Sequence, residues 1–388
     1  MHLDQITCPA DLRRLSTDEL EALAEEIRAL IVDSVTANGG HLGSNLGVVE
    51  LTMALHRVFD SPRDIMLWDT GHQAYVHKIL TGRADGFGSL RKTGGMSGYP
   101  SRKESDHDWI ENSHASTVLS YAYGLATAQA ADGGEGRRVI AVIGDGALTG
   151  GMAFEGLNNL GHSGKNVIIV LNDNGRSYAP TVSRLSDSLK HLRNNPKYVR
   201  TQAKLERKIS EAVPFSEHVE RAIEATKAAV REMWDTTSFF EDLGIRYNGP
   251  FDGHDIEELE RAFRNATQME GPTVIHVMTE KGRGYAPAEN DPVKRLHDMG
   301  APKPGSYTAA FTEAMLKEAE AHPELVAITA AMPDSCGLLP FSERYPDRCI
   351  DVGIAEQHAV TAAAGMAMGG LRPVFAVYAT FLSRAFDQ

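Results

Sequence analysis

Apolar residues in this chain form short continuous runs and helically spaced segments, a pattern typical of parallel α/β proteins. Near the N-terminus, Ser16 and Glu19 are predicted to form a capping box, and apolar residues then recur at helical spacing. Farther on, continuous apolar runs at 139–143 and 167–171 flank a predicted helix at 150–160. Such runs are typical of strands buried on both faces of a parallel sheet. The pattern therefore predicts a βαβ unit within a parallel-sheet α/β fold.

Two segments interrupt this pattern and divide the chain. Residues 183–215 hold many Lys, Arg, Asn and Ser with little periodicity, and we expect them to form a long mobile insertion. Residues 286–306 are rich in proline and glycine and are the best candidate for a domain boundary. A second α/β pattern, with a predicted strand at 325–329, follows this boundary. We therefore expect a first domain over 1–300 and an incomplete second domain over 301–388.

The composition is that of a globular protein with an acidic balance. Among 388 residues, 42% are hydrophobic and 23% are charged, and the net charge is −13. This balance argues against non-specific binding to nucleic acid and against a basic membrane-binding surface. The three cysteines lack CxxC spacing, so neither a disulfide framework nor a zinc site is indicated. With no signal peptide or transmembrane-length run visible, we expect a cytoplasmic protein without nucleic-acid or membrane partners.

Polar residues follow both apolar runs at the points where the predicted strands end. The sequence GDG stands at 144–146, and NDN stands at 172–174. Because ligands bind at the carboxyl ends of strands in open α/β sheets, both turns are expected to line one site. Asp145 and Asn174 offer oxygen ligands that suit Mg²⁺ bridging a diphosphate, while the glycines let the backbone approach phosphate oxygens. GDG alone is usually a plain strand-to-helix turn, but the second turn makes a diphosphate cradle the better interpretation.

Five segments, including the first of these turns, carry a resemblance to a known family. They are GHLGSNLGVVEL at 40–51, GHQAY at 71–75, GDGALTGGM at 144–152, KGRGY at 281–285 and DVGIAEQH at 351–358. In these segments the chain resembles the 1-deoxy-D-xylulose-5-phosphate synthases, which are relatives of transketolase. The resemblance implies a transketolase-like, thiamine diphosphate-binding α/β fold with thiamine diphosphate and Mg²⁺ as cofactors. It also implies that the third domain of the family is absent from these 388 residues.

The resemblance implies roles for individual residues. Glu356 would be the carboxylate that activates the aminopyrimidine of the cofactor, and His41 and His297 would act on the substrate side. Tyr378 and Arg384 would hold the substrate, with the guanidinium group as a phosphate clamp. The alternative for Arg384 is a solvent-exposed arginine at a chain end. The metal ligands would be Asp145 and Asn174. The other cofactor-contacting positions would be His72, Ser113, His114, Ala115, Gly146, Ala147, Asn174, Lys281 and Tyr285, with Ser113 to Ala115 standing where many members have Gly-His-Ser.

The reaction implied by the resemblance joins pyruvate to glyceraldehyde 3-phosphate. It releases CO₂ and gives 1-deoxy-D-xylulose 5-phosphate, a precursor of isoprenoids, thiamine and pyridoxal phosphate. The resemblance also implies a homodimer. Other hypotheses remain open: a non-catalytic thiamine diphosphate-binding fragment, one half of a split enzyme that works with a separate C-terminal half, or another transketolase-family enzyme.

Overall fold

The larger part of the molecule is built on a five-stranded parallel sheet. The computed structural model describes residues 2–131, 136–176, 235–292, 295–297 and 305–388. Within these residues the larger sheet has the order β1-β2-β3-β5-β4, and every neighbouring pair is parallel. Its strands are β1 (Ile65–Trp68), β2 (Val139–Gly144), β3 (Ile168–Asp173), β4 (Arg246–Asp252) and β5 (Thr273–Met278).

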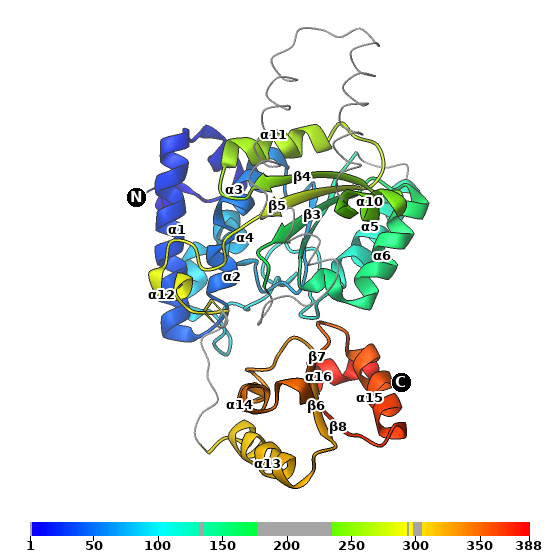
Figure 1. Ribbon diagram of the computed structural model, residues 1–388. Helices are drawn as coiled ribbons and strands as arrows, with labels where there is room; N and C mark the ends of the chain where they lie inside the picture. Colours follow the sequence, from blue (N-terminus) through cyan, green and yellow to red (C-terminus); the bar gives the residue numbers. More distant parts are fainter. Residues whose placement is uncertain (1, 132–135, 177–234, 293–294, 298–304) are drawn as a thin grey trace.

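Helices cover both faces of this sheet (Figure 1). Alternate strand residues face opposite layers: Ile140 packs in the core with α1, α3 and α11, whereas its neighbour Ala141 packs in the core with α5 and α6. Helix α1 begins at the predicted capping box, where the Ser16 amide donates to the Glu19 carboxylate at 2.8 Å. The helices are α1 (Thr17–Asn38), α2 (Gly43–Leu46), α3 (Val49–Val58), α4 (Tyr75–Lys78), α5 (Val118–Ala131), α6 (Gly151–Ser163), α10 (Asp235–Asp242), α11 (Ile256–Ala266) and α12 (Ala286–Glu289).

A smaller parallel sheet follows in the C-terminal part of the chain, below the larger sheet in Figure 1. Its order is β7-β6-β8, with β6 (Leu325–Thr329), β7 (Cys349–Asp351) and β8 (Arg372–Phe375). Its helices are α13 (Tyr307–Ala321), α14 (Leu339–Arg344), α15 (Glu356–Met368) and α16 (Ala379–Leu382). Its core is small and centres on Phe341, Leu338 and Met315. Short 3-10 or π turns occupy Leu3–Gln5, Pro9–Arg14, Ile79–Arg83, Ala84–Ser89, Ala147–Thr149, Pro346–Arg348 and Ser383–Ala385.

The structure confirms the strands with the strongest apolar pattern. The predicted strands at 139–143 and 167–171 correspond to β2 and β3, and the predicted strand at 325–329 is β6. The sequence pattern did not predict β4, which includes Gly249–Pro250, or β7, which is only three residues long. The predicted insertion at 183–215 lies outside the described residues. No helix in the described part of the chain has the length and apolarity needed to cross a membrane.

Candidate functional site

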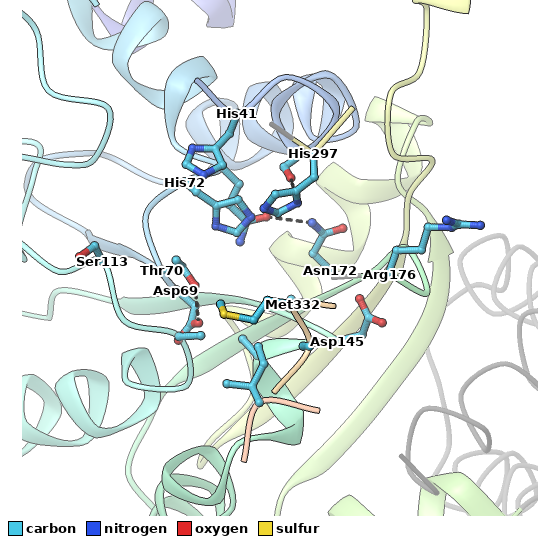
Figure 2. A pocket seen from close by; sticks show the side chains of 18 of the residues that line it. His41, Asp69, Thr70, His72, Ser113, Asp145, Asn172, Arg176, His297 and Met332 are labelled. Carbon is cyan, nitrogen blue, oxygen red and sulfur yellow. Dashed lines mark hydrogen bonds between the residues drawn. The ribbon is translucent and has the colours of Figure 1, made fainter. Parts of the chain in front are cut away.

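A cavity lies where the carboxyl ends of the two sheets meet (Figure 2). From the larger sheet, the loops that follow β1, β2, β3 and β5 contribute Asp69, Asp145, Asn174 and Lys281. From the smaller sheet, the loops after β6 and β7 reach the same cavity, and Glu356 enters it from the start of α15. Because open α/β sheets bind ligands at the carboxyl ends of their strands, this cavity is the candidate functional site.

Asp145 and Asn174 are brought together by the pairing of β2 with β3. Gly144 lies opposite Asn172 in the sheet, and the Asp145 amide donates to the Asn172 carbonyl at 3.1 Å. The Asp145 residue is only 3% exposed. The Asn174 side-chain oxygen accepts from the Arg176 amide at 3.1 Å, which holds the second turn closed. The predicted neighbourhood of the two turns is therefore confirmed.

The donor set at these turns suits a hard cation. In the described ranges, no group of three or more His, Cys, Asp or Glu side chains could hold a metal ion. Asp145 and Asn174 instead offer one carboxylate and one amide oxygen. Mg²⁺ takes few protein ligands and completes its shell with water and phosphate oxygens, whereas structural zinc sites need four protein ligands of the Cys and His type. The residues present therefore fit Mg²⁺ bound together with a phosphate-bearing group.

Three histidines lie together on the opposite side of the cavity from Asp145 (Figure 2). The ring centres of His41 and His72 are 5.3 Å apart, those of His72 and His297 are 5.1 Å apart, and those of His41 and His297 are 5.4 Å apart. Burial, followed by the charges of His41 and Lys281, lowers the pKa of His72 well below its usual value. The buried Nδ1 of His72 has no hydrogen-bond partner among the described atoms, so a polar ligand would satisfy it.

Lys281 fixes the proton arrangement of His297. The Lys281 Nζ lies 2.7 Å from His297 Nδ1, and the Ser44 hydroxyl lies 3.2 Å from the same nitrogen. An ammonium group can only donate, so Nδ1 must accept and the ring proton stays on Nε2. Lys281 and His297 are 5% and 6% exposed, so this arrangement is screened from water. Opposite the ammonium group, His297 presents Nε2 as its donor.

Asp69, which the sequence prediction did not include, organises one wall of the cavity. Its two carboxylate oxygens accept from the amides of Ser116 at 2.8 Å and Val118 at 3.1 Å. The Ser116 hydroxyl in turn donates to the Ala147 carbonyl at 2.6 Å. Burial raises the pKa of Asp69 to about 6, against the lowering effect of these backbone hydrogen bonds. The signal in the sequence is its position directly after the apolar run at 65–68, which forms β1.

Glu356 and Arg384 meet on the side of the cavity formed by the smaller sheet. Glu356 is 4% exposed, and Arg384 Nη1 lies 3.7 Å from its carboxylate. Both residues line the cavity. The Ile354 amide, two residues before Glu356, donates to the Thr149 hydroxyl at 3.2 Å and joins this side to the larger sheet.

Most of the other predicted site residues also line the cavity, but three do not. Ser113, Ala115, Gly146 and Ala147 line it together with His41, His72 and the residues already described. His114, Tyr285 and Tyr378 are not among the residues that line the cavity, so their predicted contacts with cofactor or substrate stay predictions. The His114 ring packs edge-on against Phe381, the Tyr378 ring stacks on the same phenylalanine, and Tyr285 packs against the α1–α3 core.

Together, two parallel sheets that face each other across one ligand cavity define a transketolase-like α/β protein. Solved transketolases share this fold: the chain matches that of Leishmania mexicana with a TM-score of 0.51 at 17% identity, covering 95% of this chain and 65% of that one. The transketolase of Campylobacter jejuni matches with a TM-score of 0.53 at 15% identity, covering 96% of this chain and 67% of that one.

Sequence comparison narrows the class to one family. The family model of 1-deoxy-D-xylulose-5-phosphate synthase matches residues 3–279, and that of the transketolase pyrimidine-binding domain matches residues 303–388. The chain therefore belongs to the 1-deoxy-D-xylulose-5-phosphate synthase family. It is 54% identical to the synthase of Mycobacterium avium and 52% identical to that of Nocardia farcinica, in both cases over all of this chain. The chain spans 62% and 63% of the length of these two relatives.

Proposed function

We propose that this chain binds thiamine diphosphate and Mg²⁺ in the cavity between its sheets and takes part in the synthesis of 1-deoxy-D-xylulose 5-phosphate. The substrates are pyruvate and glyceraldehyde 3-phosphate, and CO₂ is the second product. The observation that carries the proposal is the placement of Asp145 and Glu356 on opposite sheets around one cavity. The names of the relatives support the choice of reaction.

The residues of the cavity fit the two ends of the cofactor. Asp145 and Asn174 would hold Mg²⁺ and, through it, the diphosphate, while Gly146 lets the backbone approach phosphate oxygens. Glu356 is the buried carboxylate that would hydrogen-bond the aminopyrimidine ring. When bound, the cofactor supplies the nucleophilic carbon and the electron sink that decarboxylation needs.

The histidines and Arg384 would serve the substrates. His297 presents Nε2 as a hydrogen-bond donor because Lys281 occupies Nδ1, so it is suited to hold a substrate oxygen or give it a proton. His41 lies beside it with a ring-centre distance of 5.4 Å. Arg384 borders the same cavity and would clamp the phosphate of glyceraldehyde 3-phosphate through paired hydrogen bonds. Tyr378, whose ring stacks on Phe381 of the cavity lining, would also hold the substrate.

We also propose a cytoplasmic homodimer as the working form. All three cysteines are free, as expected for a reducing compartment. The C-terminal part of the chain exposes large apolar side chains, with Met368 90% exposed, Phe386 87% and Leu382 48%. Such a surface is typical of a site where another chain or segment packs.

A coupled assay with pyruvate, glyceraldehyde 3-phosphate, Mg²⁺ and thiamine diphosphate tests the proposal. It is run on the chain alone and with the remaining C-terminal part of a relative, and calorimetry measures cofactor binding separately. We expect binding by the chain and turnover at least in the supplemented sample. Absence of both would refute the proposal, and turnover only with other ketose or aldose substrates would indicate another transketolase-family enzyme.

A non-catalytic or split form is the second candidate, since the chain spans 62% of the length of its Mycobacterium avium relative. Tight cofactor binding without turnover by either sample would favour a non-catalytic binding module. Turnover that strictly requires the added part would favour one half of a split enzyme. The Asp145→Asn variant is the control in both assays, since it removes the proposed metal carboxylate with little change in volume.

A further inference from the structure

A series of hydrogen bonds outside the cavity lining connects Glu50 and His254 to the backbone next to Lys281. Glu50, on α3, accepts from His254 Nδ1 at 3.0 Å, and His254 Nε2 accepts from the Glu280 amide at 2.9 Å. Glu280 directly precedes Lys281, whose Nζ lies 2.7 Å from His297 Nδ1. Glu50 and His254 do not line the cavity, so ligand contact does not explain them.

The donor and acceptor of each of these hydrogen bonds follow from the groups involved. The Glu280 amide can only donate, so His254 Nε2 must accept and the ring proton lies on Nδ1, facing the Glu50 carboxylate. The other oxygen of Glu50 accepts from the Arg28 guanidinium, which keeps the carboxylate charged. Glu50 is 8% exposed and Arg28 is 4% exposed, so water competes little with these contacts. His254 is therefore held in one tautomer and one orientation.

The segment that carries Lys281 is packed so closely that it has little room to shift. A Cβ at Gly47 would lie 2.8 Å from the Glu280 carbonyl oxygen and 3.3 Å from the Lys281 Cα. A Cβ at Gly284 would lie 2.7 Å from Arg28 Cδ. Because the backbone is close-packed against neighbouring segments here, a shift of the Glu280 amide should also shift Lys281.

We propose that Glu50 and His254 are positioning residues that set where the Lys281 ammonium meets His297. The two residues act through the backbone of Glu280 and touch neither cofactor nor substrate. The inference concerns the same cavity as the proposed function. It concerns the contact between Lys281 and His297, so it can be tested without turnover.

The test compares two substitutions at one position in the full chain. His254→Gln keeps an acceptor where Nε2 stood, whereas His254→Leu has similar bulk and no acceptor. Histidine ring ¹⁵N NMR spectra then report whether His297 Nδ1 still accepts from an ammonium group. We expect His254→Leu to move the Nδ1 resonance toward that of a free acceptor, and His254→Gln to keep the wild-type position. Lys281→Met, which removes the donor, gives the reference for complete loss.

Several results would overturn this proposal. An unmoved His297 resonance in folded His254→Leu protein would do so, as would equal shifts in the Leu and Gln variants. His107→Leu is the matched control, because His107 bonds Ser61 at 2.8 Å away from the cavity lining, and it should leave His297 unmoved. If His254→Leu does not fold, Glu50→Asp replaces it: the charge opposite Arg28 remains, the carboxylate withdraws from His254, and the same shift is expected or the proposal fails.

Cofactor affinity gives a second readout that separates this proposal from the proposed function. We expect His254→Leu to weaken binding of Mg²⁺–thiamine diphosphate about tenfold. The reason is that Lys281 would be displaced from its proposed charge-assisted contact with the cofactor. Adding Lys281→Met to His254→Leu should cause no further loss beyond Lys281→Met alone. If wild-type protein binds no cofactor while the NMR shifts occur as expected, the proposed function fails and the positioning role stands. Additive losses would contradict the positioning role.

Discussion

Gly43 has no room for a side chain, and it lies against the segment that carries His297. A Cβ built on Gly43 would lie 2.0 Å from the Arg295 carbonyl oxygen and 3.3 Å from that of Leu296. The φ angle of Gly43 is outside the left-handed region, so an alanine here would be opposed by space and not by backbone conformation. Gly43→Ala must therefore displace the Arg295–His297 segment by about 1.4 Å, the difference between 2.0 Å and the 3.4 Å of ordinary contact.

The expected cost follows from the two hydrogen bonds that hold this segment. The Gly43 amide donates to the Leu296 carbonyl at 2.8 Å, and the Leu42 amide donates to the His297 carbonyl at 3.2 Å. A displacement of about 1.4 Å breaks both, and each contributes about 0.5–1.5 kcal/mol net. The substitution should therefore lower the free energy of opening this segment by about 1–3 kcal/mol. This increases the population of the open form about 5- to 150-fold.

Hydrogen exchange measures this opening directly. In Gly43→Ala, exchange at the amides of Leu42 and Gly43 should accelerate by that factor, while amides in the β2–β3 pair keep their protection. The matched control is Gly124→Ala on α5, where a Cβ would meet nothing within 4 Å. It should leave exchange unchanged and stabilise the helix by up to about 1 kcal/mol. Unchanged exchange rates at positions 42 and 43 in the Gly43→Ala variant would refute the reasoning.

Three other substitutions test the charged groups around the site. Asp145→Asn should weaken Mg²⁺-dependent binding of thiamine diphosphate by more than about tenfold in calorimetry with an unchanged circular dichroism spectrum, and equal affinity would contradict the assignment. Burial raises the pKa of Glu50, but His254 and Arg28 outweigh it and lower that pKa to about 2 from 4.5. The resulting stability, about 3 kcal/mol at most, is complete above pH 4.5 and lost as the pH falls toward 2. Glu50→Gln should remove this part of the pH dependence of urea unfolding, and an unchanged slope would count against it. Arg384→Met should raise the KM for glyceraldehyde 3-phosphate far more than that for pyruvate, and equal increases would argue against a phosphate clamp.

The side of the site proposed to bind metal could be predicted from sequence because its determinants are local. The runs at 139–143 and 167–171 are apolar throughout, so they specify strands buried on both faces of a sheet. Once both are parallel neighbours, their carboxyl ends must lie together, and the polar turns at 144–146 and 172–174 follow. Family resemblance added Glu356. Its burial depends on how α15 packs beside the smaller sheet, which residue spacing does not specify.

The supporting contacts could not be predicted because they join residues far apart in the chain. Glu50 and His254 are separated by 204 positions, and neither lies in a pattern that indicates the other. The strand β4 was missed because Gly249 and Pro250 interrupt its apolar pattern, and its register shifts there. The inward or outward direction of Tyr285 depends on packing against the α1–α3 core, which no local motif specifies.

The two sides of the cavity are supported to different degrees, and this affects what each can be expected to do. On the larger sheet, Asp145 sits beside a strand covered on both faces, and the backbone next to Lys281 is held by the series of hydrogen bonds that begins at Glu50. On the smaller sheet, α15 carries Glu356, but only Glu356 and Ala359 of that helix are buried. Metal binding should therefore depend mainly on the larger sheet. Reactions that need Glu356 should respond more strongly to any chain or segment that covers the exposed face of α15.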